Sequence, residues 1–525
     1  MSRSMSRSTS LSASLKSLKL GTALAAALAL GAPLAPALAG PADNSLVWSA
    51  QKELTAADTY FDTSREAVVV AQHVYDGLVF WDQQAQEFKP LLADEWRQID
   101  PLTLEFDLRE GVTFHDGSSF GPKDVVYTLN FVTDEKNGVL NYGDIKWIKS
   151  TEQVGERTVR IHLNEPFPAA LSYLALVLPI LPDGHFDKAE TGSDGNKRFA
   201  AVPPVGTGPY KVTSFGNGDT VVMQANEAYF DGPKGKPQIG TLTYRTIADG
   251  ATQIAELMTG GIDWVWGISN DQAENLAQAP HLTSVNAPTM RISYLTFDLK
   301  GTSGTDVFTD ARVRKAVGHA IDRANIARHL MGENSQVVNA ACHPVQFGCT
   351  SDVTAYDHDP EKAKALLAEA GKADGFSVDL YGYRDREVTE AIMGDLAKVG
   401  IKANLRWLQY SAARDLIREG KVPVANMSWG SSSIPDVSAI TSYFFGGGPD
   451  DPAKDPALQE AIRRADLASD PDVRLASYAE ALQLIADEAY WLPLFSYTKN
   501  YSYNAQLDFT PSADELPRFY ATSWK

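Results

Sequence analysis

Residues 377–429 alternate between strand-like and helix-like segments, and this order leaves few topologies open. Residues 377–381 and 403–408 have strand character, and the segment between them places apolar residues at helical spacing. Another short helix then precedes a third strand at residues 425–429. Because strands that alternate with helices usually lie parallel in one sheet, we predict an α/β fold with a parallel sheet covered by helices.

The chain before this region is richer in short strands. Residues 103–108 and 158–163 alternate apolar and polar side chains, which is typical of half-buried strands. From about Asp310 the pattern becomes helical, and we predict one helix over residues 311–331. A second helix is predicted to start after Asp359, its N-cap, and to end at Gly371.

The last part of the chain indicates a return to the first half of the molecule. A long helical stretch is predicted over residues 456–489, and residues 492–503 have strand character again. If this strand completes the first lobe, the chain crosses between two lobes twice. Two crossings form a hinge, and the cleft between lobes is a common place for a small-molecule site.

The N-terminal segment is predicted to be a signal peptide over residues 1–39. It contains no acidic residue, carries bases at its start, runs apolar over residues 20–30 and ends in Ala37-Leu38-Ala39. A membrane-anchoring helix is the alternative, but Gly31 and two prolines interrupt a run already shorter than the roughly 20 residues that span a bilayer. No cysteine lies near the cleavage site, so we expect an exported soluble protein without a lipid anchor.

Length and charge narrow the class of protein. A chain of 525 residues exceeds what one core usually holds, so at least two domains are expected. Apolar residues make up 44% and charged residues 22%, which excludes fibrous and disordered classes. The formal net charge of -19 would repel phosphate backbones, so no nucleic-acid partner is expected.

The two cysteines are predicted to form a disulfide. Cys342 and Cys349 are seven residues apart, Pro344 and Gly348 let the chain turn back, and an exported compartment is oxidising. The alternative is a metal site that uses both cysteines and His343, which lacks a fourth ligand.

Several motifs in order along nearly the whole mature chain resemble the bacterial extracellular solute-binding proteins of family 5, which serve peptide, nickel and glutathione ABC importers. The motifs are YDGL at 75–78, KPLLA at 89–93, LREGVTFHDG at 108–117, DVVY at 124–127, GTGPY at 206–210, YFDG at 229–232, GGID at 260–263, RVRKA at 312–316, AIDR at 320–323 and the helix that ends at Gly371.

The resemblance implies a two-lobed periplasmic binding-protein fold, large and of the type II-like class, with an extra subdomain in the first lobe. We expect lobe I at residues 40–287 with a subdomain inserted at about 83–199, lobe II at 288–492, and a return to lobe I at 493–525. It further implies a monomer in the periplasm that binds a small molecule or short peptide and delivers it to inner-membrane permease subunits. No catalytic residue, metal or cofactor is expected.

One predicted ligand-binding loop follows the strand at 425–429. In peptide-binding relatives a Trp in this loop is followed by an Asp that pairs with the ligand's α-amino group. Here Trp429 matches, but Ser431, Ser432 and Ser433 occupy the amine-anchoring stretch, and the nearest acid is Asp436. The loop resembles the glutathione-type branch more than the dipeptide binders, while a flexible turn is the structural alternative for the serines.

A second predicted loop supplies positive charge. Arg384 and Arg386 follow Tyr381 and Tyr383, and a guanidinium beside aromatic rings suits a ligand carboxylate. An exposed arginine that pairs with Asp385 or Glu387 at a helix start is an equal alternative. Two tryptophans are also open to both interpretations, because Trp264 and Trp266 suit either the cleft or the core of the first lobe.

The remaining titratable motifs are interpreted as structural. His115 precedes an Asp-Gly turn, and no second metal ligand repeats at suitable spacing. In Asp357-His358-Asp359 the last residue is expected to cap a helix.

Two other functions find less support in the sequence. A secreted two-domain hydrolase lacks support, because the chain has no Gly-x-Ser-x-Gly, no His-Glu-x-x-His and no nucleophile with an identifiable base. A nickel or haem binder of the same family would need His or Met in the cleft segments, and the two loops above contain no His.

Overall fold

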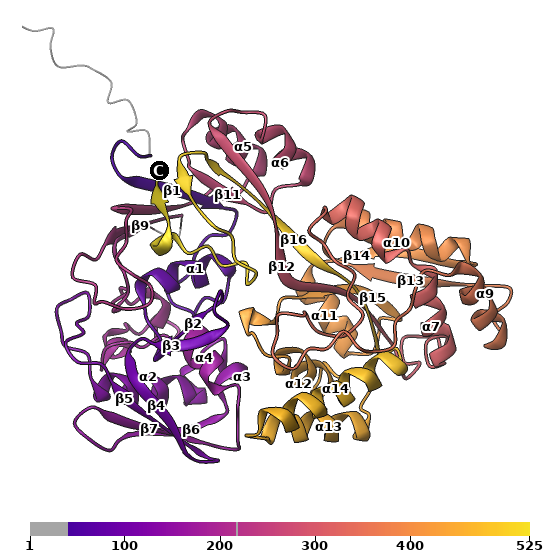
Figure 1. The fold of residues 1–525 in the computed structure, drawn as a ribbon, viewed down its shortest axis with the longest axis horizontal. Coiled ribbons are helices and arrows are strands. Elements are labelled where there is room, and N and C mark those ends of the chain that lie inside the picture. The colour runs from indigo at the N-terminus through magenta and orange to yellow at the C-terminus, as the bar shows by residue number, and fades with distance from the viewer. Residues whose placement is uncertain (1–39, 217–218) are drawn as a thin grey trace, which may run out of the picture. The chain divides into compact units, whose positions relative to one another are not determined.

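A ten-stranded mixed sheet runs through the computed structural model, which describes residues 40–216 and 219–525 (Figure 1). The predicted signal peptide at 1–39 lies outside the described residues. In spatial order the strands are β14 (Ile401–Trp407), β13 (Phe376–Gly382), β15 (Val424–Trp429), β12 (Leu282–Phe297), β16 (Trp491–Asn504), β11 (Trp264–Trp266), β1 (Ser45–Ala50), β10 (Thr241–Thr246), β9 (Thr220–Ala225) and β8 (Tyr210–Gly216).

The parallel part of this sheet lies where the strand–helix alternation predicts it. β13 pairs in parallel with β14 on one side and with β15 on the other. The helices α10 (Arg386–Lys398) and α11 (Tyr410–Arg418) connect these strands in turn. The α/β fold class and these three predicted strands are therefore confirmed.

Two long strands link the two halves of the sheet. β12 and β16 pair antiparallel over most of their length and run side by side through the middle of the sheet (Figure 1). Toward one end β16 pairs with β11, and toward the other β12 pairs with β15. The sheet is thus continuous, and the chain passes along its middle twice in opposite directions.

Smaller sheets lie in the first half of the chain and at its end. The predicted strands at 103–108 and 158–163 are confirmed as the central pair of a four-stranded antiparallel sheet. Its order is β4 (Ala93–Asp100), β5 (Thr103–Leu108), β7 (Thr158–Leu163) and β6 (Ile148–Gln153), and two-stranded pairs are formed by β2 (Val79–Asp82) with β3 (Glu87–Pro90) and by β17 (Leu507–Asp508) with β18 (Ser523–Trp524).

Helices cover both halves, and within the described ranges none is long and apolar enough to cross a membrane. The remaining α-helices are α1 (Arg65–Val74), α2 (Pro122–Thr133), α3 (Tyr142–Ile145), α4 (Ala170–Leu176), α5 (Gly250–Thr259), α6 (Asn270–Leu276), α7 (Ala311–Ala320), α8 (Arg323–Ile326), α9 (Pro360–Glu369), α12 (Ser438–Phe445), α13 (Pro456–Leu467) and α14 (Pro471–Asp487).

The helix predicted over 311–331 is wrong as a single helix. α7 ends at Ala320 because Ile321 is extended, and Asp322 then caps the short α8 through the N–H of Asn325. The break brings the guanidinium of the next residue, Arg323, among buried main-chain carbonyls, including that of Pro493 at 3.0 Å. A buried cation that is satisfied in this way compensates for the lost helical hydrogen bonds.

The long helical stretch predicted over 456–489 is also two helices. Ala468 is extended, and Asp470 caps α14 with Pro471 in its first turn. The cap and proline favour a new helix start at this point. By contrast, the helix capped by Asp359 is confirmed as α9, and Gly371 follows it in the left-handed conformation.

The buried apolar side chains form separate cores on the two sides of the long strands. The largest core takes residues mainly from 46–287 and 501–520, and two others take theirs from 292–497. The predicted lobe and subdomain boundaries stay predictions, but we use "first lobe" and "second lobe" below for the parts that contain these cores.

Candidate functional site

A cavity of about 800 Å³ is lined by residues from both lobes and from β16. Its volume falls within the usual range for small-molecule sites. Most of its lining residues come from 50–66, 250–272, 384–387 and 497–500. We call it the charged cavity, because its lining includes the acidic and basic residues Arg65, Glu66, Arg384, Asp385, Glu387, Lys499 and Glu515.

Arg384 is the one residue of the predicted ligand-binding set that lines this cavity. It follows β13, and its guanidinium lies 5.7 Å from the centre of the Tyr497 ring. Within the described residues no carboxylate forms an ion pair with it. Arg384 therefore presents a guanidinium without an ion pair on the second-lobe side of the cavity, although the neighbouring Asp385 carboxylate interacts with it at longer range.

Glu515 is buried in the same region, between two arginines. Its carboxylate accepts hydrogen bonds from Arg291 at 2.9 and 3.2 Å and from Arg65 at 3.2 Å. Burial alone would raise the pKa of Glu515, but Arg291, Lys499 and Arg65 outweigh it and hold that pKa well below its usual value. Glu515 is consequently an ionised internal partner of the arginines.

Lys499 on β16 packs on the indole of Trp266. Its ammonium lies 3.8 Å from the ring centre, a cation–π distance, and both residues line the charged cavity. Burial lowers the pKa of Lys499 to about 8, with nearby arginines adding to this effect and Glu515 opposing it. Of the two tryptophans left open by the sequence, Trp266 lines the cavity and Trp264 is a core residue with no exposed surface.

The predicted serines lie beside the charged cavity. Ser431, Ser432 and Ser433 have φ of 54°, 50° and 67°, a left-handed conformation that costs non-glycine residues about 1 kcal/mol or more each. The Ser433 hydroxyl accepts a hydrogen bond from Arg65 at 2.6 Å and donates one to the Asp514 carbonyl at 3.1 Å. We call residues 431–433 the serine loop. It connects the second lobe to α1 and to the C-terminal segment.

Trp429 and Asp436 already have partners within the protein, and neither lines the charged cavity. The Trp429 indole stacks on Tyr443 and donates its N–H to the Ala439 carbonyl at 2.9 Å. Asp436 is buried and forms an ion pair with buried Arg474 at 2.8 Å. Their ligand-binding roles stay predictions, although the Asp436 charge is neutralised without a ligand.

Tyr381, Tyr383 and Arg386 are likewise outside the cavity lining. The Tyr383 hydroxyl bonds to the Ser428 hydroxyl at 2.7 Å, while Tyr381 packs against a second-lobe core. Arg386 is exposed and pairs with Glu390 one turn along α10. Its exposure agrees with the alternative interpretation of an arginine at a helix start, but its partner is Glu390 rather than Asp385 or Glu387.

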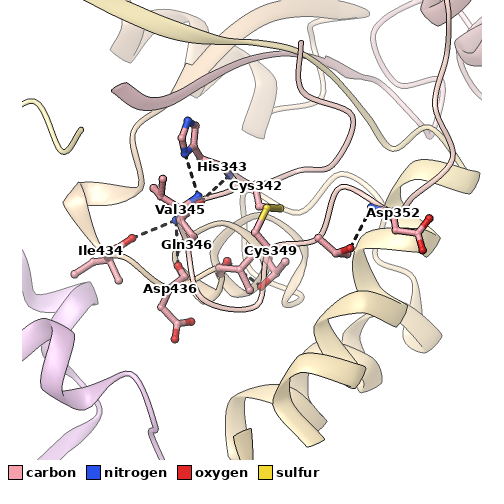
Figure 2. Close-up of a disulfide and its surroundings, with 11 residues drawn as sticks. Cys342, His343, Val345, Gln346, Cys349, Asp352, Ile434 and Asp436 are labelled. Atoms are coloured by element: carbon pink, nitrogen blue, oxygen red, sulfur yellow. Dashed lines mark hydrogen bonds between the residues drawn. A yellow bond between two sulfur atoms is a disulfide. The ribbon is translucent and has the colours of Figure 1, made fainter. Parts of the chain in front are cut away.

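The disulfide between Cys342 and Cys349 is present, so these cysteines are not metal ligands in the structure. Figure 2 shows Gln346, which lies between the two cysteines, beside Ile434 and Asp436. Gln346 donates to the carbonyls of Ile434 and Asp436, both at 3.2 Å. The disulfide loop therefore supports the segment that follows the three serines.

The remaining motifs have structural partners. His115 bonds to the Gly208 carbonyl at 2.9 Å, which ties the FHDG turn to the GTGPY turn. Asp359 accepts the N–H of Lys362 as the predicted N-cap of α9. In the described ranges, no group of three or more His, Cys, Asp or Glu residues is arranged to hold a metal ion.

Comparison with known proteins identifies the family. The family described as "Bacterial extracellular solute-binding proteins, family 5 Middle" matches residues 87–451, which is more than half of the chain. The chain belongs to this family. Its function is therefore solute binding, as the motifs indicated.

Relatives of this family 5 protein include the glutathione-binding protein GsiB of Salmonella typhi. It is 27% identical over 480 residues, covering 87% of this chain and 90% of GsiB. The GsiB of Escherichia coli O1:K1 / APEC is 26% identical over 474 residues, covering 86% and 89%.

Solved structures confirm the two-lobed binding-protein fold. The substrate-binding protein CtaP from Listeria monocytogenes superposes with a TM-score of 0.80 at 21% identity, covering 91% of this chain and 99% of CtaP. NikA from Brucella suis, in complex with Fe(III)-EDTA, gives 0.79 at 24% identity, covering 92% and 100%.

Sequence reasoning missed most of the cavity of this family 5 protein. Arg65 lies in a distant part of the chain from Lys499 and Glu515, and no sequence pattern relates the three residues to one another. Trp266 is a candidate cleft residue in the sequence, but its cation–π contact with Lys499 is not visible there. The usable signal was the predicted C-terminal return, because it places residues 497–515 between the lobes.

Proposed function

We propose that this family 5 protein captures a peptide or peptide-like solute in the charged cavity and delivers it to the permease of an ABC importer. The periplasm is the proposed compartment. We further propose that the protein acts as a monomer, and that it binds its solute without converting it chemically.

One observation carries this proposal: the charged cavity presents unpaired groups of both signs. Neither Arg384 nor Glu66 forms an ion pair with another of the described residues. A peptide-like solute carries an ammonium and a carboxylate, so Glu66 suits its ammonium and Arg384 suits its carboxylate.

The positions of these groups agree with capture between lobes. Glu66 lies in the first turn of α1 in the first lobe, whereas Arg384 follows β13 in the second lobe. A solute that contacts both would favour the closed arrangement, because it gains both contacts only there. The relatives named above as glutathione-binding proteins support a peptide-like solute.

Native mass spectrometry of protein purified from its own periplasm tests the proposal, followed by calorimetric titration with the co-purified solute. We expect a zwitterionic solute of peptide size, with binding weakened in Glu66→Gln and Arg384→Ala. A co-purified nickel complex or haem, or a solute whose affinity is the same in both variants, would contradict it.

A further inference from the structure

Lys499 is a charged group in the cavity that the proposed ammonium and carboxylate contacts do not use. Its ammonium touches the face of Trp266, yet no hydrogen bond or ion pair to it occurs among the described residues. Partly burying an ammonium without such a partner costs free energy, because the charge loses water contacts that nothing replaces. A bound anion would offset that cost.

Three arginines and two glutamates interact electrostatically with Lys499. Glu515 attracts it, while Arg65, Arg291 and Arg384 repel it. Glu515, however, already accepts hydrogen bonds from Arg65 and Arg291. Glu66 also senses Lys499 but lies beyond ion-pair distance. Asp385 and Glu387 also line the cavity, so what attracts an anion here is the Lys499 ammonium itself, which has no hydrogen-bond or ion-pair partner among the described residues.

Arg384 and Lys499 provide two separate positions for anions. Arg384 belongs to the second lobe, and Lys499 lies on the strand between the lobes. Each packs on a different aromatic ring, Tyr497 and Trp266 respectively. One carboxylate of a solute can satisfy Arg384 and leave Lys499 free for another.

We propose that Lys499 on Trp266 is a specificity-determining position that selects solutes with a second acidic group. This inference rests on the proposed function. It narrows the solute class to peptide-like molecules that carry two carboxylates and one ammonium, because Glu66 takes the ammonium and the two cations take the acids.

The test uses pairs of α- and γ-linked tripeptides that are identical except for Glu against Gln at one position. Titration of the wild-type protein should show that at least one Glu member binds ten-fold or more tightly than its Gln partner. In Lys499→Met this ratio should fall below two-fold, whereas Lys499→Arg should keep most of it.

A matched control is Lys402→Met, which removes an exposed lysine on β14 away from the cavity and should leave the ratio unchanged. Equal binding of every Glu and Gln pair by the wild-type protein would overturn the inference without any variant. A ratio preserved in a folded Lys499→Met would do the same. If no tripeptide binds at all, the proposed peptide-like solute is wrong and this assignment fails with it.

Discussion

At the scale of single residues, Arg384 and Arg386 allow a direct comparison of two neighbouring arginines. They are two positions apart, yet only Arg384 lines the charged cavity, and Arg386 pairs with Glu390 in solvent. We expect Arg384→Ala to weaken binding of the native solute by about 2 kcal/mol, roughly 30-fold, as loss of a charged anchor commonly does. Calorimetric titration measures this, with Arg386→Ala as a control that should bind normally.

Ligand chemistry separates a direct contact from a general loss of charge. Amidation of the solute's carboxylate should make wild type and Arg384→Ala bind equally, since the group that Arg384 contacts is then uncharged. If Arg384→Ala binds the free acid as tightly as wild type does, the assigned contact is wrong.

His73 makes the stability of the protein depend on pH. It is fully buried on α1, its Nδ1 lies 2.7 Å from the Val69 carbonyl, and its Nε2 accepts the Tyr520 N–H at 3.2 Å. Burial lowers the pKa of His73 to about 3, with Lys234 and Arg518 contributing. Because the unfolded chain takes up a proton near pH 6.5, stability is retained above that pH and lost below it.

From pH 6.5 to 5, this one histidine is expected to cost about 2 kcal/mol of unfolding free energy. Denaturant unfolding at pH 7 and pH 5 should therefore show that the free energy of unfolding falls less in His73→Gln than in the wild-type protein. His358→Gln, at an exposed turn, serves as the control and should keep the full drop. An identical drop in all three proteins would exclude His73 as a source.

At the scale of elements, the disulfide loop and the serine loop support each other. The three left-handed serines need external contacts, and the Gln346 bonds to residues 434 and 436 supply some of them. Replacing Cys342 and Cys349 by Ser should lower the unfolding free energy by about 2.5 kcal/mol, the value that chain entropy gives for an eight-residue loop. Chemical denaturation of the double variant tests this loss.

Solute binding should weaken in the same variant, because the disordered loop would hold Ser433 less firmly beside Arg65. Peptide mapping without reduction supplies the companion measurement and should recover the two cysteines in one linked fragment. Free thiols in protein from the periplasm would contradict the assignment.

Local sequence patterns predicted the helices and strands better than they predicted the residues of the charged cavity. The parallel strands β13, β14 and β15 and the capped α9 have strong periodicity and punctuation, so they could be predicted with their approximate ends. The helix over 311–331 could not, since its break depends on Arg323 reaching carbonyls far along the chain. The charged cavity has the same character, because Lys499, Trp266 and Arg384 meet only through tertiary structure.

At the scale of the whole molecule, solute binding should change the shape of the protein. A solute held by Glu66 and Arg384 contacts both lobes, so closure is favoured by the contacts made only in that state. Small-angle scattering should give a smaller radius of gyration with the native solute than without it. The midpoint temperature of thermal unfolding should rise with solute concentration, because the solute binds the folded protein and not the unfolded chain.

A rise in the thermal midpoint without any compaction would show that hinge closure is the wrong mechanism, although binding itself would stand. Arg384→Ala provides the internal comparison, since a solute bound only to the first lobe should compact the protein less.

The C-terminal segment from Tyr501 onward also determines when the first lobe can fold during synthesis. The first-lobe core contains Tyr501, Phe509, Phe519 and Tyr520, which are among the last residues that the ribosome makes. Until they emerge, the apolar surface formed by residues 46–287 has no complete cover, and a chain truncated by about 25 residues would never supply it. The nascent chain should therefore remain a chaperone client until it is nearly complete.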